Sequence, residues 1–270
     1  MKPLLIFLLL LPCLACEPTE STLIDTEKAV IEAYLHVDRG VDSLRITKSI
    51  SYQTDSLALP LEMLDVNLSD GTQTVLLDDF GKGYYGIKDW VIEADKTYVL
   101  SFTYADREVM AETYAPAKTP ITISEEELYM TKVEGFNFGA NADVEPVEIS
   151  WENEQGDYYY VVVENLEEDP TYINADLQER LQAGENLPIF ELRSEPTITD
   201  FYSVDARRQI QQFGTHRVIV FRVNTEYAAL YQSAGNTSLS LADPPSNVQN
   251  GFGIFTAAHS DTVFFEVRER

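Results

Sequence analysis

The two cysteines of the chain, Cys13 and Cys16, close an apolar N-terminal run and are the residues best placed for covalent modification. The run extends from Leu4 to Leu11 behind a single basic residue, Lys2. It is shorter than the roughly 20 apolar residues that cross a bilayer as a helix. It therefore has the pattern of a signal peptide, and a cysteine at the cleavage site of such a peptide is the acceptor for a lipid.

Cys16 is the better acceptor of the two. Ala15, which precedes it, is the small residue that a signal peptidase accepts, whereas Pro12 restricts the backbone before Cys13. We therefore predict a lipoprotein signal peptide over residues 1–15, acyl chains such as palmitate on Cys16, and a polar tether over residues 16–26. The mature chain then has no second cysteine, so neither a disulfide nor a thiolate metal site can form.

The charge balance limits the kinds of partner. The chain has 45 acidic and 19 basic residues, a formal net charge of −26. Such a surface repels nucleic acid and disfavours adhesion to anionic headgroups, so contact with a membrane is expected through the lipid. Hydrophobic residues make up 44% of the chain and aromatic residues 11%, which is typical of a folded protein rather than a disordered one.

Short alternating runs separated by turn signals predict strands in the first half of the chain. In Val30–Val37, every second residue is apolar, and the hairpin signal Asp70-Gly71 separates two further runs. Thr97–Tyr104 and Val109–Tyr114 are expected to pair. A linker bracketed by two prolines follows, which predicts a first β-sandwich domain over residues 27–118.

The second half begins a new series of strands. Val147–Trp151 and Tyr158–Asn165 resemble the second and third strands of a fibronectin type III module, in which a Trp of the earlier strand packs under a Tyr of the next. Arg217–Val223 and Val263–Val267 are expected to be strands, and Asp176–Leu181 and Glu226–Gln232 to be short helices. The predicted fold class is all-β, with two stacked immunoglobulin- or fibronectin-III-like sandwiches. The second, over residues 121–270, has a short helical insertion.

Enzyme motifs are absent from the sequence. It contains no GxSxG, no HExxH, no P-loop and no dinucleotide-binding glycine pattern. The three histidines, His36, His216 and His259, are isolated, and single histidines on strands more often pack than bind metal. The acidic turns lack the spacing of an EF-hand. We therefore expect no catalytic residues, no metal and no cofactor.

The sharpest local motif is a proline- and glycine-containing segment over residues 243–255. Two prolines stiffen its start, Ser246-Asn247 can close an Asx-type turn, and glycines at 251 and 253 allow close backbone approach. It is either a rigid loop that crosses the end of the sandwich or a loop that docks a partner. The candidate docking residues are Pro244, Pro245, Ser246, Asn247, Gly251 and Phe252.

Several segments together resemble a lipoprotein family of Bacteroidota, the domain of unknown function DUF4249. They are VIEAYLHV, GKGYYG, DKTYVLSFTY, YAALYQ and ADPPSNVQNGFGIFTAA. The resemblance implies an exported, lipid-anchored outer-membrane protein, because members are often encoded beside TonB-dependent receptors. It implies Cys16 as the lipid site and Pro245, Ser246, Asn247 and Gly251 as a characteristic loop, and it implies no catalytic residues.

The expected function is thus a non-enzymatic outer-membrane accessory protein, a partner of a TonB-dependent receptor in nutrient uptake. The alternative is a stand-alone surface module that binds a glycan or a peptide, with Trp90 and the Tyr84-Tyr85 pair as an aromatic platform. Asp-Ser-apolar triplets make Ser43 and Ser56 candidate O-glycosylation sites.

Overall fold

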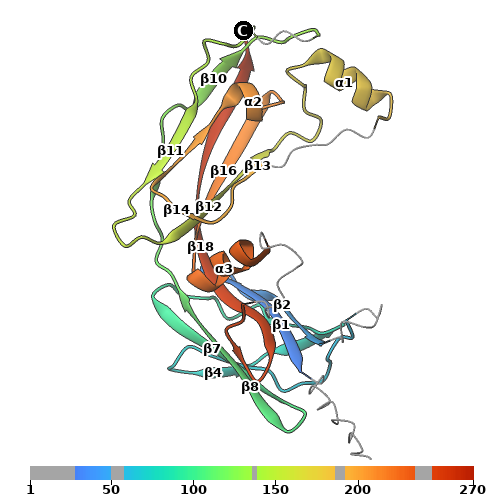
Figure 1. Ribbon diagram of the computed structural model, residues 1–270, viewed down its shortest axis with the longest axis vertical. Helices are drawn as coiled ribbons and strands as arrows, with labels where there is room; N and C mark the ends of the chain where they lie inside the picture. Colours follow the sequence, from blue (N-terminus) through green and yellow to red (C-terminus); the bar gives the residue numbers. More distant parts are fainter. Residues whose placement is uncertain (1–27, 50–57, 136–138, 186–191, 235–244) are drawn as a thin grey trace, which may run out of the picture.

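The structure is a computed structural model that describes residues 28–49, 58–135, 139–185, 192–234 and 245–270. The chain is mainly β and forms two sandwich-like units, one above the other, with a bend between them (Figure 1). The strand β18 (Phe252–Glu269) runs through both units, so one ten-stranded sheet continues across the bend. The mainly-β fold class predicted from the sequence is confirmed.

In the first unit, the first half of β18 pairs in parallel with β1, from Val30 opposite Phe252 to His36 opposite Ala258. This sheet continues through β1 (Ala29–His36), β2 (Val41–Lys48), β6 (Tyr84–Ile87) and β5 (Asp78–Gly81). The facing sheet consists of β17 (Val248–Gln249), β8 (Arg107–Ala115), β7 (Lys96–Tyr104), β3 (Asn67–Ser69) and β4 (Thr74–Leu76). The core between them includes the fully buried Tyr85, Tyr98 and Phe255.

In the second unit, the second half of β18 pairs antiparallel with β16, from Ala258 opposite Val223 to Val267 opposite Gly214. This part of the sheet contains β16 (Gly214–Val223), β12 (Tyr158–Asn165), β13 (Leu192–Arg193), β14 (Thr197–Ile198) and, on the other edge of β18, β10 (Glu127–Met130). The facing sheet has the order β15 (Phe201–Val204), β11 (Val147–Trp151), β9 (Ile121–Ile123). The helices are α1 (Ala175–Gln182), α2 (Ala206–Gln209) and α3 (Thr225–Ala234).

Several predicted elements are confirmed. The alternation of Val30–Val37 places Ile31, Ala33 and Leu35 in the core and turns Glu32 and Tyr34 outward. The strands β11 and β12 have the predicted bounds, and the rings of Trp151 and Tyr159 lie 5.1 Å apart across the two sheets. Both predicted helices form, as α1 and α3.

The last strand differs from the prediction. A strand was expected only over Val263–Val267, whereas β18 begins at Phe252, inside the predicted loop, and its first half belongs to the first unit. The physical reason is the close approach of β1. Gly253 has a φ of +98°, and a Cβ there would lie 2.0 Å from the carbonyl oxygen of Ile31, so glycine marks strand contact here rather than a turn.

Candidate binding site at the junction of the two units

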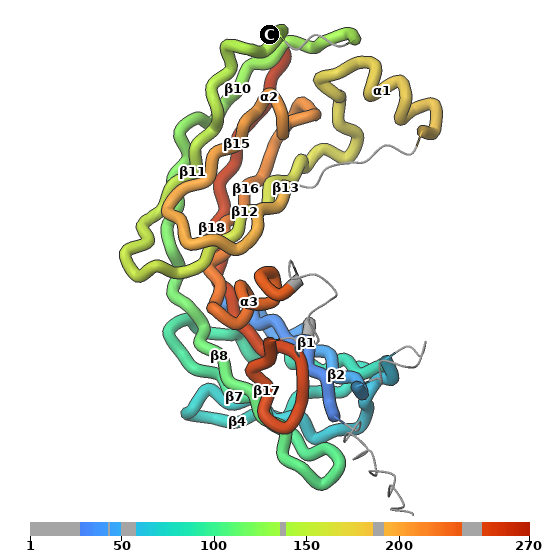
Figure 2. Tube along the Cα trace, viewed as in Figure 1, coloured from blue at the N-terminus to red at the C-terminus, as the bar shows by residue number. Residues whose placement is uncertain are grey.

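The helix α3 lies in the bend between the two units (Figures 1 and 2). It follows β16 directly and packs against β18. Two hollows flank it, one polar and one aromatic, and both are lined by residues of the first and the second unit. The junction is therefore where a ligand would contact both units at once.

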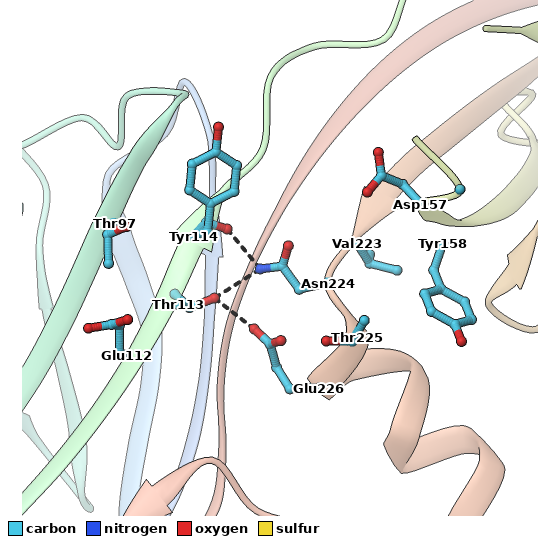
Figure 3. A pocket seen from close by; sticks show the side chains of 11 residues that line it. Thr97, Glu112, Thr113, Tyr114, Asp157, Tyr158, Val223, Asn224, Thr225 and Glu226 are labelled. Carbon is cyan, nitrogen blue, oxygen red and sulfur yellow. Dashed lines mark hydrogen bonds between the residues drawn. The ribbon is translucent and has the colours of Figure 1, made fainter. Parts of the chain in front are cut away.

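The polar hollow, of about 310 Å³, is lined by residues around Thr113, Tyr114, Asn224 and Glu226 (Figure 3). The Asn224 side-chain amide donates to the Thr113 hydroxyl at 2.9 Å and to the Tyr114 carbonyl at 2.7 Å. The Thr113 hydroxyl donates in turn to a Glu226 carboxylate oxygen at 2.8 Å. These hydrogen bonds connect β8 of the first unit to the corner between β16 and α3. We call them the latch, because they hold the two units together.

Further contacts fix the chain segment that connects the units. The Nδ1 of His259 lies 3.1 Å from the Pro116 carbonyl oxygen, and its Nε2 lies 3.3 Å from a carboxylate oxygen of Asp38. Lys118 forms an ion pair of 2.9 Å with Asp261. Together with the continuous β18, these contacts give the junction a defined geometry.

The aromatic hollow, of about 290 Å³, is lined by later residues of α3, from Tyr227 to Tyr231, and is rich in tyrosine rings. Tyr160 of β12 and Tyr227 of α3 stack with ring centroids 5.5 Å apart, and Tyr34 of β1 meets Tyr227 edge to face at 6.2 Å. The Tyr227 and Tyr231 hydroxyls are 3.4 Å apart. His36 of β1 also lines this hollow.

Four titratable groups of the aromatic hollow have shifted pKa values, each in the direction that favours the uncharged form. Burial raises the pKa of the Tyr160 and Tyr34 phenols. Burial, with the neighbouring Tyr231 hydroxyl, raises the pKa of Tyr227 strongly. Burial also lowers the pKa of the His36 imidazole. An apolar site with a few neutral donors and acceptors suits binding of a small uncharged molecule.

The docking-loop residues lie at the entry to β18, and two of them serve the fold. The Asn247 amide donates to the Glu112 carbonyl at 3.0 Å and to the Phe255 carbonyl at 2.6 Å. Gly251 has no room for a side chain, because a Cβ would lie 2.8 Å from Val248 and 2.9 Å from the Ala29 carbonyl.

The remaining loop residues are more accessible. Ser246 is exposed, and Pro245 and Phe252 are half-buried, with the Lys28 ammonium 4.6 Å from the Phe252 ring centroid. Pro244 and the predicted lipid acceptor Cys16 lie outside the described residues. A docking surface on this loop would therefore centre on Pro245, Ser246 and Phe252.

The aromatic platform expected at Trp90 and Tyr84-Tyr85 does not form as one surface. Tyr85 is fully buried, and its hydroxyl donates to the Leu61 carbonyl at 2.8 Å. Trp90 is half-buried against the first core, 5.9 Å from the Tyr98 ring. Only Tyr84 is exposed. The period-two pattern places Tyr84 and Tyr85 on opposite faces of β6, which explains the difference.

The histidines lie apart from one another. His36 lines the aromatic hollow, His259 is at the junction, and His216 is buried in the second unit, stacked on Phe265 at 5.0 Å. Among the described residues, no group of three or more His, Cys, Asp or Glu side chains could hold a metal ion. Of the candidate glycosylation sites, Ser43 lies within β2, and Ser56 lies outside the described residues.

Sequence reasoning missed the aromatic hollow because its rings come from three distant elements. The available signal was tyrosine at outward-facing strand positions, Tyr34 in β1 and Tyr160 in β12, together with the pair Tyr227 and Tyr231 one helical turn apart. Only the folded sheet brings these positions together.

The segments that build this junction, from β1 to β18, belong to one family pattern. The family model described as "Domain of unknown function (DUF4249)" matches residues 16–263. The chain belongs to the DUF4249 family. The match begins at Cys16 and includes both units of the DUF4249 chain, the helix α3 and most of β18.

The DUF4249 chain has no significant match among curated proteins. Among solved structures, it is similar to one titled "Anomalous substructure of Titin-A168169", with 8% sequence identity, 90% of this chain and 97% of that chain covered, and a TM-score of 0.23. Within the described part of the DUF4249 chain, no helix has the length and apolar character needed to cross a membrane.

Proposed function

We propose that this DUF4249 protein is a lipid-anchored outer-membrane accessory protein of a bacterium of the Bacteroidota, and a non-enzymatic partner of a TonB-dependent receptor in nutrient uptake. The observation that carries the proposal is the N-terminal pattern that ends at Cys16. The family match supports it, because the shared sequence begins at this same residue. Residues 1–15 are then the signal peptide that is removed on export.

The arrangement of the two units suits a tethered partner. The strand β1 begins in the first unit, and the chain ends at the far end of the second unit (Figure 1). Residues 17–28 between the lipid and β1 reach at most about 40 Å, at roughly 3.3–3.6 Å per residue. The first unit therefore stays close to the membrane, and the second unit projects from it.

Both units are immunoglobulin- or fibronectin-III-like sandwiches in this proposal. The second unit supports the assignment: the sheet β9-β11-β15 faces the sheet β13-β12-β16-β18, with the Trp151–Tyr159 contact between them. Seven strands in this order make the sandwich architecture that many cell-surface domains share.

The lipid anchor is tested by a matched pair of variants, Cys16→Ser and Cys13→Ser. Cells that express each variant are labelled with radioactive palmitate and separated into membrane and soluble fractions. Wild type and Cys13→Ser should carry label and sediment with the outer membrane, whereas Cys16→Ser should lose the label. Label that persists in Cys16→Ser would contradict the anchor.

The receptor partnership is tested by photo-cross-linking in cells. A photo-reactive benzoylphenylalanine replaces the exposed Ser246, and the same residue replaces the exposed Tyr129 of β10, in the second unit, as the control. We expect a cross-link to one TonB-dependent receptor from position 246 and none from position 129. Equal cross-linking from both positions, or none from position 246, would contradict docking through this loop.

A second candidate function, a stand-alone module that binds a glycan or a peptide, is favoured by the aromatic hollow. The hollow has aromatic rings and hydroxyl groups, and burial favours the uncharged forms of Tyr160 and His36. The two functions are compatible, because neither Pro245 nor Ser246 is among the described residues that line the aromatic hollow.

A further inference from the structure

The floor of the aromatic hollow contains a polar group without a partner. Thr256 of β18 lines the hollow and is 3% exposed, and its hydroxyl is buried with no hydrogen-bond partner among the described residues. A buried hydroxyl that bonds to nothing costs stability, and such a group in a native structure calls for an explanation. A ligand hydroxyl that reaches the floor would supply the missing hydrogen bond.

The walls of the hollow present ring faces. Tyr160 stacks with Phe221, at 4.6 Å, and with Tyr227, at 5.5 Å between ring centroids. Tyr34 is 36% exposed, and Tyr231 is half-buried. The face of an aromatic ring is electron-rich and attracts hydrogens that carry partial positive charge, such as the C–H hydrogens on the apolar face of a sugar ring.

The polar groups of the hollow are also those that a sugar needs. Phenol hydroxyls donate and accept hydrogen bonds, and a neutral imidazole does both through its two nitrogens. Burial favours the uncharged forms of Tyr227 and His36, and none of the described residues that line the hollow is acidic, lysine or arginine. The site therefore matches a neutral polyhydroxyl ligand better than a charged one.

A peptide fits this site less well. The floor strand β1 pairs with β2 on one side and with β18 on the other, and β18 pairs with β1 and then with β16. Where they line the hollow, β1 and β18 pair with each other, so an extended peptide cannot add between these two strands. An apolar side chain alone would leave the Thr256 hydroxyl unsatisfied.

We infer that the aromatic hollow is a binding site for a neutral saccharide, with Tyr34 and Tyr231 as stacking residues and Thr256 as a hydrogen-bonding residue at the floor. The volume of about 290 Å³ lies at the lower limit of small-molecule sites, which suits one or two sugar rings of a longer chain. This inference deepens the second candidate function. It is independent of the lipid anchor and of the receptor partnership, so failure here leaves those tests unchanged.

The test titrates the full mature protein, purified in detergent, with four neutral tetrasaccharides: maltotetraose, cellotetraose, xylotetraose and chitotetraose. Tetragalacturonate serves as the charged probe, and acetyl-Leu-Leu-Phe-amide as the apolar peptide. Calorimetry measures each dissociation constant. We expect saturable binding of at least one neutral tetrasaccharide and none of the charged probe or of the peptide.

Three variants then locate the site. Tyr34→Ala and Tyr231→Ala should each weaken binding about fivefold or more, because each removes one stacking face. Tyr129→Ala removes an equally accessible tyrosine outside the hollow and should leave the dissociation constant unchanged.

Thr256→Val is the most discriminating variant, because it separates folding from binding. It replaces a buried hydroxyl that has no partner by a methyl group, so thermal stability should stay equal or rise. The affinity for the neutral tetrasaccharide should nevertheless fall about fivefold or more.

Three outcomes would overturn the inference: no neutral tetrasaccharide binds, the charged probe or the peptide binds more tightly, or the variants Thr256→Val and Tyr231→Ala bind as wild type does.

Discussion

Asn247 forms hydrogen bonds to both backbone groups of Phe255: its Oδ1 accepts the Phe255 N–H at 3.0 Å, and its Nδ2 donates to the Phe255 carbonyl at 2.6 Å. The same Nδ2 donates to the Glu112 carbonyl in β8. One side chain thus joins the two sheets of the first unit at the point where β18 begins. The segment over residues 243–255, the most characteristic of the sequence, therefore has a structural role: the Asn247 side chain connects the two sheets.

Removal of the Asn247 hydrogen bonds should destabilise the first unit. Asn247→Ala removes three hydrogen bonds and should cost about 2–3 kcal/mol of unfolding free energy, measured by urea denaturation. Asn247→Asp should cost more, because a carboxylate oxygen would face two carbonyl oxygens. Gln249→Ala, at an exposed position of β17, is the control and should change stability by less than about 0.5 kcal/mol. An Asn247→Asp variant as stable as wild type would contradict the structural role of these hydrogen bonds.

The parallel pairing of β1 with β18 depends on Gly253. Gly253→Ala should cost about 3 kcal/mol or more, or prevent folding, because its Cβ would lie 2.0 Å from the Ile31 carbonyl oxygen and its φ is +98°. Gly156→Ala is the matched control, since its φ is +72° but the space around it is open; we expect a cost of about 1 kcal/mol. Equal thermal stabilities for the two variants would show that crowding by Ile31 has no effect.

Asp70 should make the stability of the first unit depend on pH. The Lys96 ammonium, 2.9 Å away, together with the Gln73 N–H, holds the pKa of this buried carboxyl below its usual range. Because the folded pKa is lowered, this stabilisation is present above the unfolded pKa of about 3.9 and is lost as the pH falls below it. Asp70→Asn keeps an acceptor for the N–H groups but removes the ion pair.

Asp70→Asn should therefore unfold at lower urea concentration than wild type at pH 7, and the gap should narrow as the pH falls from about 4 towards 3. A gap of the same size at pH 3 and at pH 7 would rule out the ion pair as its cause.

The hydrogen bonds of the latch, from Asn224 and Glu226 to β8, should restrict motion between the two units. Asn224→Ala removes the bonds to the Thr113 hydroxyl and the Tyr114 carbonyl and should cost about 1–2 kcal/mol. Amide hydrogen exchange should increase at Thr113, Tyr114 and the first turn of α3, while the core of the second unit stays protected. Thr225→Ala, one residue along and exposed, should leave this exchange pattern unchanged. Uniform exchange across the whole chain would instead indicate global destabilisation.

Local patterns in the sequence predicted the strands well. The alternation of Val30–Val37 and the adjacent strands before and after Gly156 follow from short-range periodicity, which any folded arrangement has to respect. The contact between Trp151 and Tyr159 was expected from the resemblance of these two strands to a fibronectin type III module.

Long-range features were not accessible in the same way. The pairing of β1 with β18 joins residues more than 200 positions apart. The glycines that allow this pairing lie in a segment whose composition is typical of a loop. The aromatic hollow likewise requires β1, β12 and α3 to meet, which no spacing in the sequence encodes. Tyr85 was expected in an exposed platform but belongs to the core. Of two consecutive residues in a strand, only one can face outward, and here that residue is Tyr84.

The measurement that tests the central claim most directly is affinity purification of the tagged protein from solubilised native outer membranes, with quantitative mass spectrometry of the proteins that accompany it. The Cys16→Ser variant serves as the parallel control. We predict recovery of one TonB-dependent receptor in near-equal amount with wild type and its loss with Cys16→Ser. If wild type is lipidated and folded but no receptor accompanies it, the accessory function is contradicted.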